Sequence, residues 1–205
     1  MPLSELLESS PMFRHFVEDV CAYPHPSGHE VALLQHIADL ANAKGYPVRR
    51  DEAGNLSFLV PGRGKYVQTK RALMLQGHPD MVPKKLDTVE HDFEKDPIMV
   101  VLENGYIRAE GTTLGADNGL GLAVAFSVAF NDRLETPPLV VLMTVREETD
   151  MHGAKNLDPY LCFPDEVTLV GGLNLDSEEG VEEVYFGCAG GQPVTSVKMR
   201  RNDNV

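Results

Sequence analysis

One histidine and several carboxylates of this chain stand beside apolar segments that have the length of buried strands or helices. They are His78, Asp80, Asp117, Glu147, Glu148 and Asp176. Imidazole and carboxylate groups without a thiolate suit zinc, manganese or cobalt. Carboxylates that are buried together repel one another unless protons or a cation neutralise them. If these residues converge, a bound metal is the simplest explanation.

Three continuous apolar runs predict the strands that would position these residues. The runs cover 72–75, 139–145 and 168–175, and each is followed by members of this set. Turn signals at Gly54–Asn55 and Asn104–Gly105 predict two hairpins in addition. Because such runs alternate with helices, we expect an α/β fold with a mixed, mostly parallel sheet covered by helices on both faces. The carboxyl ends of parallel strands share one edge, where ligand sites form.

Helix signals are found before and between these strands. Ser10 and Pro11 suit the first turn of a helix. Ser27 and Glu30 have the spacing of a capping box, which predicts that a second helix begins beside them. Residues 118–132 are apolar nearly all round and predict a buried helix. That helix would start directly after Asp117.

Each of these features also has a plainer explanation. A single histidine beside a strand is more often structural, and adjacent glutamates or the segment DSEEG more often form a solvated loop. Gly115 and Gly119 are typical of turns. The acidic spacing of a calcium loop is missing, and no lysine follows the glycines as in a phosphate-binding loop. The case for a metal therefore depends on four separate segments meeting.

The composition is that of a globular protein and disfavours several classes of partner. The chain has 205 residues, of which 42% are hydrophobic and 24% charged. Its net charge of −13 disfavours a nucleic-acid partner. The longest apolar run, 120–130, is too short to span a bilayer, and the N-terminus lacks a signal-peptide pattern. Three widely spaced cysteines indicate reduced thiols in the cytoplasm.

Five motifs, in this order, resemble a known enzyme family. They are GHPDMVP, GTTLGADNGLG, REETDMHGA, NLDSEEG and GCAGG, and the N-terminal segment YPHPSGHE fits as well. Together they resemble the Xaa-His dipeptidases, or aminoacyl-histidine dipeptidases, which are co-catalytic di-zinc metallopeptidases. The resemblance spans essentially the whole chain. It implies an incomplete catalytic domain with the zinc-peptidase/phosphorylase-like fold.

The resemblance also implies a role for each candidate residue. The implied metal ligands are His78, Asp117, Glu148 and Asp176. Asp117 would bridge two zinc ions, for which manganese or cobalt are possible substitutes, and a cis peptide would follow it. Asp80 would orient His78 without touching the metal. Glu147 would be the general base for water that hydrolyses dipeptides, Xaa-His such as beta-alanyl-histidine above all.

The resemblance carries an expectation about domains as well. Residues 1–205 would form the N-terminal part of the catalytic metallopeptidase domain. The family's lid domain, which makes the homodimer, and its C-terminal catalytic segment with a further metal-binding histidine would be absent from this chain. We therefore expect the chain alone to hold about one zinc ion and to lack activity. A catalytically dead metal-binding module, a truncated gene product and a structural domain with solvated acids are the alternatives.

Overall fold

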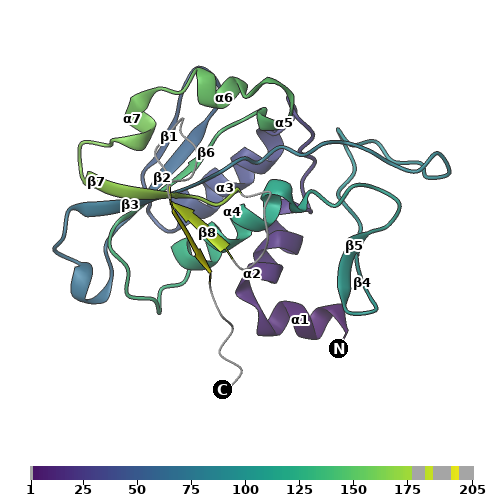
Figure 1. Cartoon of the computed structure of the whole chain (residues 1–205), viewed down its shortest axis with the longest axis horizontal. Helices are drawn as coiled ribbons and strands as arrows, with labels where there is room; N and C mark the ends of the chain where they lie inside the picture. The colour runs from purple at the N-terminus through teal and green to yellow at the C-terminus, as the bar shows by residue number, and fades with distance from the viewer. Residues whose placement is uncertain (1, 177–182, 187–194, 199–205) are drawn as a thin grey trace.

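A five-stranded sheet forms the centre of the molecule (Figure 1). The structure is a computed structural model, and it describes residues 2–176, 183–186 and 195–198. The strands of this sheet are β1 (Val48–Arg50), β2 (Leu56–Val60), β3 (Arg71–Gly77), β6 (Leu139–Met143) and β7 (Thr168–Asn174). Their order in space is β1-β2-β6-β3-β7. Thus β6 lies between two strands that precede it in the chain.

The sheet is mixed, and its four pairings divide evenly. β3 is parallel to both β6 and β7, whereas β1–β2 and β2–β6 are antiparallel. The expected α/β fold with a mixed, mostly parallel sheet is confirmed, since these pairings make β1, β3, β6 and β7 run in one direction and β2 in the other. β1 and β2 are antiparallel because the hairpin predicted at Gly54–Asn55 reverses the chain between them.

Helices lie on both sides of the sheet (Figure 1). The helices are α1 (Leu3–Ser9), α2 (Pro11–Arg14), the π-helix η1 (His15–Val20), α3 (Val31–Ala43), the 3-10 helix η2 (Gly64–Tyr66), α4 (Ala116–Ala129), α5 (Glu147–Asp150), α6 (His152–Lys155) and α7 (Pro159–Cys162). α3, α4 and η1 form the main core with the sheet, and α7 packs against Leu142 on the other side. Within the described residues, no helix is long and apolar enough to cross a membrane.

Two hairpins lie outside this sheet. They are β4 (Val100–Glu103) with β5 (Tyr106–Ala109), and β8 (Glu183–Phe186) with β9 (Thr195–Lys198). The first is the hairpin predicted at Asn104–Gly105. The turn signal was sufficient there because Asn104 (φ 52°) and Gly105 (φ 82°) both take the left-handed conformation that a tight hairpin needs.

Two helix predictions need correction. Ser10 caps α2 as expected, with the Phe13 N–H donating to its hydroxyl at 3.5 Å, but the helix continues from residue 15 to 20 as a π-helix. The capping box is wrong. α3 begins after Glu30, and no side chain caps it. Instead, Ser27 Oγ donates to the Asp80 carboxylate and Glu30 Oε1 accepts from the Arg146 N–H, so both side chains bond to loops that are distant in sequence.

β7 is more exposed than the central strand β6. Val170 and Leu173 of β7 are 46% and 47% exposed, whereas every residue of β6 is buried. β7 stands at the edge of the described sheet and pairs with β3 alone. Gly171 and Gly172 add no side chains that could fill the space. The edge position and the two glycines together account for the exposure.

Candidate metal centre

Four segments bring imidazole and carboxylate groups to one edge of the sheet. Gly77, the last residue of β3, is in register with Met143, the last residue of β6. Asn174 of the parallel β7 is paired with Gln76. The loops that follow these three strands therefore leave the sheet at one edge. Asp117 reaches the same place from the first turn of α4.

The His78 imidazole lies among the acids. Its Nε2 atom is 3.2 Å from Asp117 Oδ1, 3.6 Å from Asp176 Oδ2 and 4.0 Å from Glu147 Oε2. Ligand atoms of His78, Asp117 and Glu148 all lie within 4.8 Å of one another. The structure thus brings all four predicted ligands together. Donor atoms at this spacing can contact one ion with bonds of about 2.0–2.2 Å.

The site has a buried floor and an open rim. The His78 side chain is 1% exposed and that of Asp80 is fully buried, whereas the Asp117 side chain is 59% exposed. Glu147 and Asp176 are intermediate. A ligand can therefore reach the cluster from the side of Asp117, while the imidazole stays fixed beneath it.

Asp80 connects the parts of this floor. Its carboxylate accepts hydrogen bonds from the Ser27 hydroxyl at 2.6 Å and from the N–H groups of Glu147 and Glu148 at 2.9 and 3.1 Å. His78 Nδ1 lies 3.0 Å from the Asp80 carbonyl oxygen and 3.5 Å from its carboxylate. The sequence predicted that Asp80 orients His78. It did not reveal that the same carboxylate also fixes the glutamate loop.

The electrostatics of the cluster favour a bound cation. Burial opposes a charged imidazole, but the carboxylates of Asp80, Asp176 and Glu147 outweigh it and raise the pKa of His78 to about 9. Burial and neighbouring carboxylates likewise raise the pKa of Glu148 and of Asp176. The clustered negative charge therefore raises all three pKa values, and burial adds to the rise at the two acids. A divalent cation would neutralise this charge, so the residues present fit a metal.

The backbone around the cluster has several unusual features. The peptide bond Asp117–Asn118 is cis, as expected. Asn118 donates from Nδ2 to the Leu175 carbonyl at 2.9 Å, which connects the start of α4 to the end of β7 beside Asp176. A Cβ on Gly77 would lie 2.3 Å from Asn118 Oδ1, so the close approach of β3 and α4 requires glycine there.

Some sequence features remain without a structural account. Glu178, Glu179 and the motif GCAGG with Cys188 lie outside the described residues. The other two cysteines, Cys21 and Cys162, are buried free thiols. Burial raises the pKa of Cys21 to about 12, so this thiol stays protonated and gives no sign of a chemical role.

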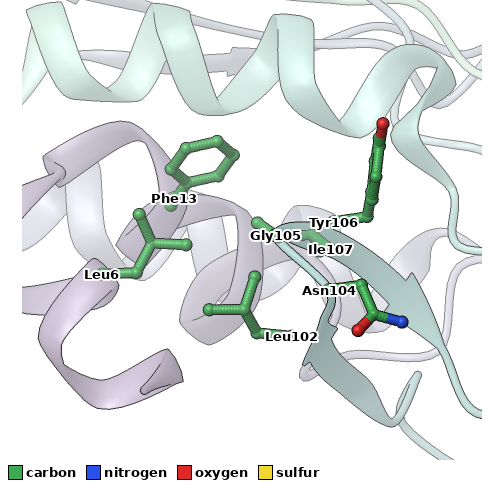
Figure 2. A pocket seen from close by; sticks show the side chains of 7 residues that line it. All are labelled: Leu6, Phe13, Leu102, Asn104, Gly105, Tyr106 and Ile107. Carbon is green, nitrogen blue, oxygen red and sulfur yellow. The ribbon is translucent and has the colours of Figure 1, made fainter. Parts of the chain in front are cut away.

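An apolar pocket lies apart from the metal cluster, between α1, α2 and the β4–β5 hairpin (Figure 2). It has a volume of about 550 Å³ and is lined by Leu6, Phe13, Leu102, Asn104, Gly105, Tyr106 and Ile107. No charged residue is in this lining, and no member of the cluster contributes to it. The pocket therefore has none of the groups that the metal chemistry needs.

Known proteins share both the sequence and the arrangement. The cytosol non-specific dipeptidase of Escherichia coli (strain K12) is 40% identical over 196 residues, which cover 95% of this chain and 39% of the relative. The crystal structure of aminoacylhistidine dipeptidase from Vibrio alginolyticus matches with a TM-score of 0.76 and 38% identity, over 87% of this chain and 35% of that one. The resemblance to the aminoacyl-histidine dipeptidases is confirmed.

Other comparisons extend the fold beyond these dipeptidases. A tripeptidase from Staphylococcus aureus matches with a TM-score of 0.66 at 21% identity, over 85% of this chain and 45% of that one, and so shares the fold. No protein-family model matches the chain. The chain spans 39% and 35% of the length of the two dipeptidases, so their names describe proteins more than twice as long.

Proposed function

We propose that this chain forms the metal-binding core of a dipeptidase that hydrolyses small dipeptides, with Xaa-His dipeptides such as beta-alanyl-histidine as the preferred class. The observation that carries the proposal is the position of His78 Nε2 among Asp117, Glu148 and Asp176, above the buried Asp80. The two dipeptidase relatives support the reaction class. One of them is named non-specific and the other aminoacylhistidine, so the substrate has to be measured.

The donor set fits zinc, with manganese or cobalt as substitutes. The metal ligands would be His78, Asp117, Glu148 and Asp176. A divalent cation held there supplies Lewis acidity, which polarises a peptide carbonyl and lowers the pKa of a water molecule. Asp80 keeps the His78 ring in the orientation that presents Nε2 to the open side.

We assign Glu147 the role of general base. Its carboxylate lies 4.0 Å from His78 Nε2 and is partly exposed. The backbone N–H of Glu147 donates a hydrogen bond to the Asp80 carboxylate, which fixes the residue in place. In the proposed reaction Glu147 accepts a proton from water as the water oxygen attacks the peptide carbon. As the C–N bond breaks, Glu147 returns that proton to the leaving amine. No nucleophile of the protein is needed.

The setting of the reaction is part of the same proposal. We assign the protein to the cytoplasm, on the name of the Escherichia coli relative. Residues 1–205 would correspond to the N-terminal part of a catalytic metallopeptidase domain, because the match covers nearly all of this chain and 39% of the relative. In the complete protein, a lid domain would supply substrate contacts and a homodimer interface. The chain alone would bind metal without turnover.

Calorimetric titration of the 205-residue chain with Zn²⁺ tests the metal centre. We expect about one zinc ion per chain, and binding weaker by at least about tenfold in His78→Ala. His91→Ala is the matched control, since the His91 ring packs edge-on against Phe93 and His91 is outside both the cluster and residues 25–30. Equal zinc affinity in wild type and His78→Ala would refute the proposal. The rates at which the complete protein hydrolyses Xaa-His dipeptides and other dipeptides are then compared to test the substrate preference.

A further inference from the structure

Residues 25–30 run beside the segment that follows β3. Pro26 and Met81 form a parallel bridge. The Met81 N–H donates to the His25 carbonyl at 3.1 Å, and the Ser27 N–H donates to the Met81 carbonyl at 3.3 Å. Backbone bonds therefore place this segment next to Asp80, before any of its side chains is considered.

The Ser27 hydroxyl makes the shortest contact to the Asp80 carboxylate. The distance from Oγ to Oδ2 is 2.6 Å, within the range of strong hydroxyl–carboxylate bonds. The other donors that bond to this carboxylate are the backbone N–H groups of Glu147 and Glu148. Among the described residues, Ser27 thus supplies the side-chain hydroxyl that completes the set. Loss of the hydroxyl would leave one oxygen of a buried anion with a single partner.

Glu30 holds the glutamate loop at the residue that precedes Glu147. Its side chain is buried, with the residue 4% exposed, and Oε1 accepts the Arg146 N–H at 2.9 Å. Arg146 has φ 56°, a left-handed conformation that is unfavourable for arginine. The bond fixes the backbone at the residue directly before Glu147.

The same segment also reaches the loop of Asp117. A Cβ added to Gly115 would lie 3.2 Å from His25 Nε2 and 3.0 Å from Met81 Sδ. His25 is buried, and its Nε2 has no hydrogen-bond partner among the described residues. Three loops that carry proposed site residues are therefore in contact with one short stretch of chain.

We propose that residues 25–30 are the positioning segment of the metal centre, with Ser27 and Glu30 as its two positioning residues. Neither residue is among the metal ligands; Ser27 acts through Asp80, and Glu30 acts through the backbone of Arg146. The proposal rests on the proposed metal centre. It gives Ser27 and Glu30 a role that differs from the helix capping their spacing predicts. Helix capping does not explain them, since neither side chain bonds to the first N–H groups of α3.

Cobalt(II) binding to the 205-residue chain tests Ser27. We expect Ser27→Ala to bind Co²⁺ about tenfold more weakly and to change the visible absorption of the bound ion, as loss of an outer-shell partner does. Ser27→Thr keeps a hydroxyl and should restore both. Ser57→Ala is the matched control, because Ser57 is buried on β2 and bonds to none of these loops. Thermal unfolding of each variant without metal separates loss of fold from loss of the site.

Glu30 provides a second, independent pair of variants. Glu30→Gln keeps an acceptor for the Arg146 N–H, whereas Glu30→Ala removes it. We expect Glu30→Ala to weaken Co²⁺ binding about tenfold and Glu30→Gln to restore most of that loss. If Ser27→Ala does not fold, this pair still decides the matter.

Three results would overturn the proposal. Unchanged Co²⁺ affinity and absorption in both Ser27→Ala and Glu30→Ala would do so while leaving the metal centre intact. A lower unfolding temperature with unchanged Co²⁺ affinity would show that the two residues serve the fold alone. Absence of Co²⁺ binding in the wild-type chain would remove the metal centre and the positioning segment together.

Discussion

At the scale of single residues, the structure distinguishes two adjacent glutamates. Glu148 belongs to the set whose ligand atoms lie within 4.8 Å of one another, and Glu147 is outside it. Successive residues of a helical turn point about 100° apart, so the side chains of Glu147 and Glu148 in α5 point in different directions. One can bind a metal while the other faces water.

This separation predicts different effects of the same substitution at the two positions. Glu148→Gln should weaken Zn²⁺ binding by about tenfold or more, because the cluster loses a charged ligand. Glu147→Gln should leave Zn²⁺ affinity within about threefold and abolish turnover in the complete protein, because the proton acceptor is lost. Metal titration of both variants checks the first part. Equal loss of affinity in the two variants would contradict this separation of roles.

Residue types indicated the proposed ligands but not the side chains that support them. His78 and the acids were predictable only as a set, because each alone is more often structural or solvated, whereas several of them following buried segments point to one shared site. Ser27 and Glu30 were misinterpreted because S-x-x-E is also the pattern of a capping box. Their partners are 53 and 116 residues away in the chain, and a local pattern contains no information about them.

At the scale of elements, a shared aspartate joins η1 to α3. Asp19 accepts from His15 Nδ1 at 2.6 Å and from His36 Nε2 at 2.8 Å, and all three side chains are less than a fifth exposed. Burial opposes the charge of Asp19, but the two histidines outweigh it and hold the pKa of this carboxyl below its usual value of 3.8. The carboxylate therefore stabilises the packing of the two helices.

Asp19→Asn should lower the free energy of unfolding by about 1–3 kcal/mol at neutral pH, the usual contribution of hydrogen bonds to a charged group. Since the folded-state pKa is depressed, the contribution is present above pH 3.8 and is lost as the pH falls through the lower folded value. Denaturant unfolding of both proteins at pH 7 and at about pH 2.5 measures the difference. A difference of equal size at both pH values would contradict the account.

A second prediction at this scale concerns Gly153, the second residue of α6. A Cβ on Gly153 would lie 2.2 Å from Asn55 Oδ1 and 2.4 Å from the Val145 nitrogen, two atoms that are hydrogen-bonded to each other. Gly153→Ala should therefore destabilise the chain by more than about 2 kcal/mol. Gly45→Ala, with free space and φ +72°, should cost about 1 kcal/mol. Thermal unfolding compares them, and equal costs would refute the steric argument.

The strands were more predictable than the environment of each strand. Both β6 and β7 come from apolar runs, yet β6 is completely buried and β7 is largely exposed. β6 has a strand on either side, whereas β7 stands at the edge of the described sheet and contains two glycines. The place of a strand in the sheet depends on residues elsewhere in the chain. The π-helix at 15–20 was not predicted, since the apolar residues Phe16 and Val20 fit either helix type. Both side chains lie close to Gly119 of α4.

At the scale of the whole molecule, the ligands come from segments between residues 78 and 176 that meet only in the folded chain. Zn²⁺ should therefore bind the folded state and raise its stability. At 100 times the dissociation constant the gain is about 2.7 kcal/mol, which corresponds to roughly 5–10 °C for a chain of this size. Thermal unfolding with Zn²⁺, and again after a chelator is added, measures it. The same shift in His78→Ala would show that the ion binds elsewhere.

The strand order also has a consequence during protein synthesis. β6 lies between β2 and β3, although both are synthesised before it. At translation rates of about 5–20 residues per second, residues 78–138 require roughly 3–12 s, and in that interval neither strand has its central neighbour. Apolar strands with free backbone edges pair readily with other chains. Nascent chains that end before Leu139 should therefore be the form of this protein that depends most on chaperones.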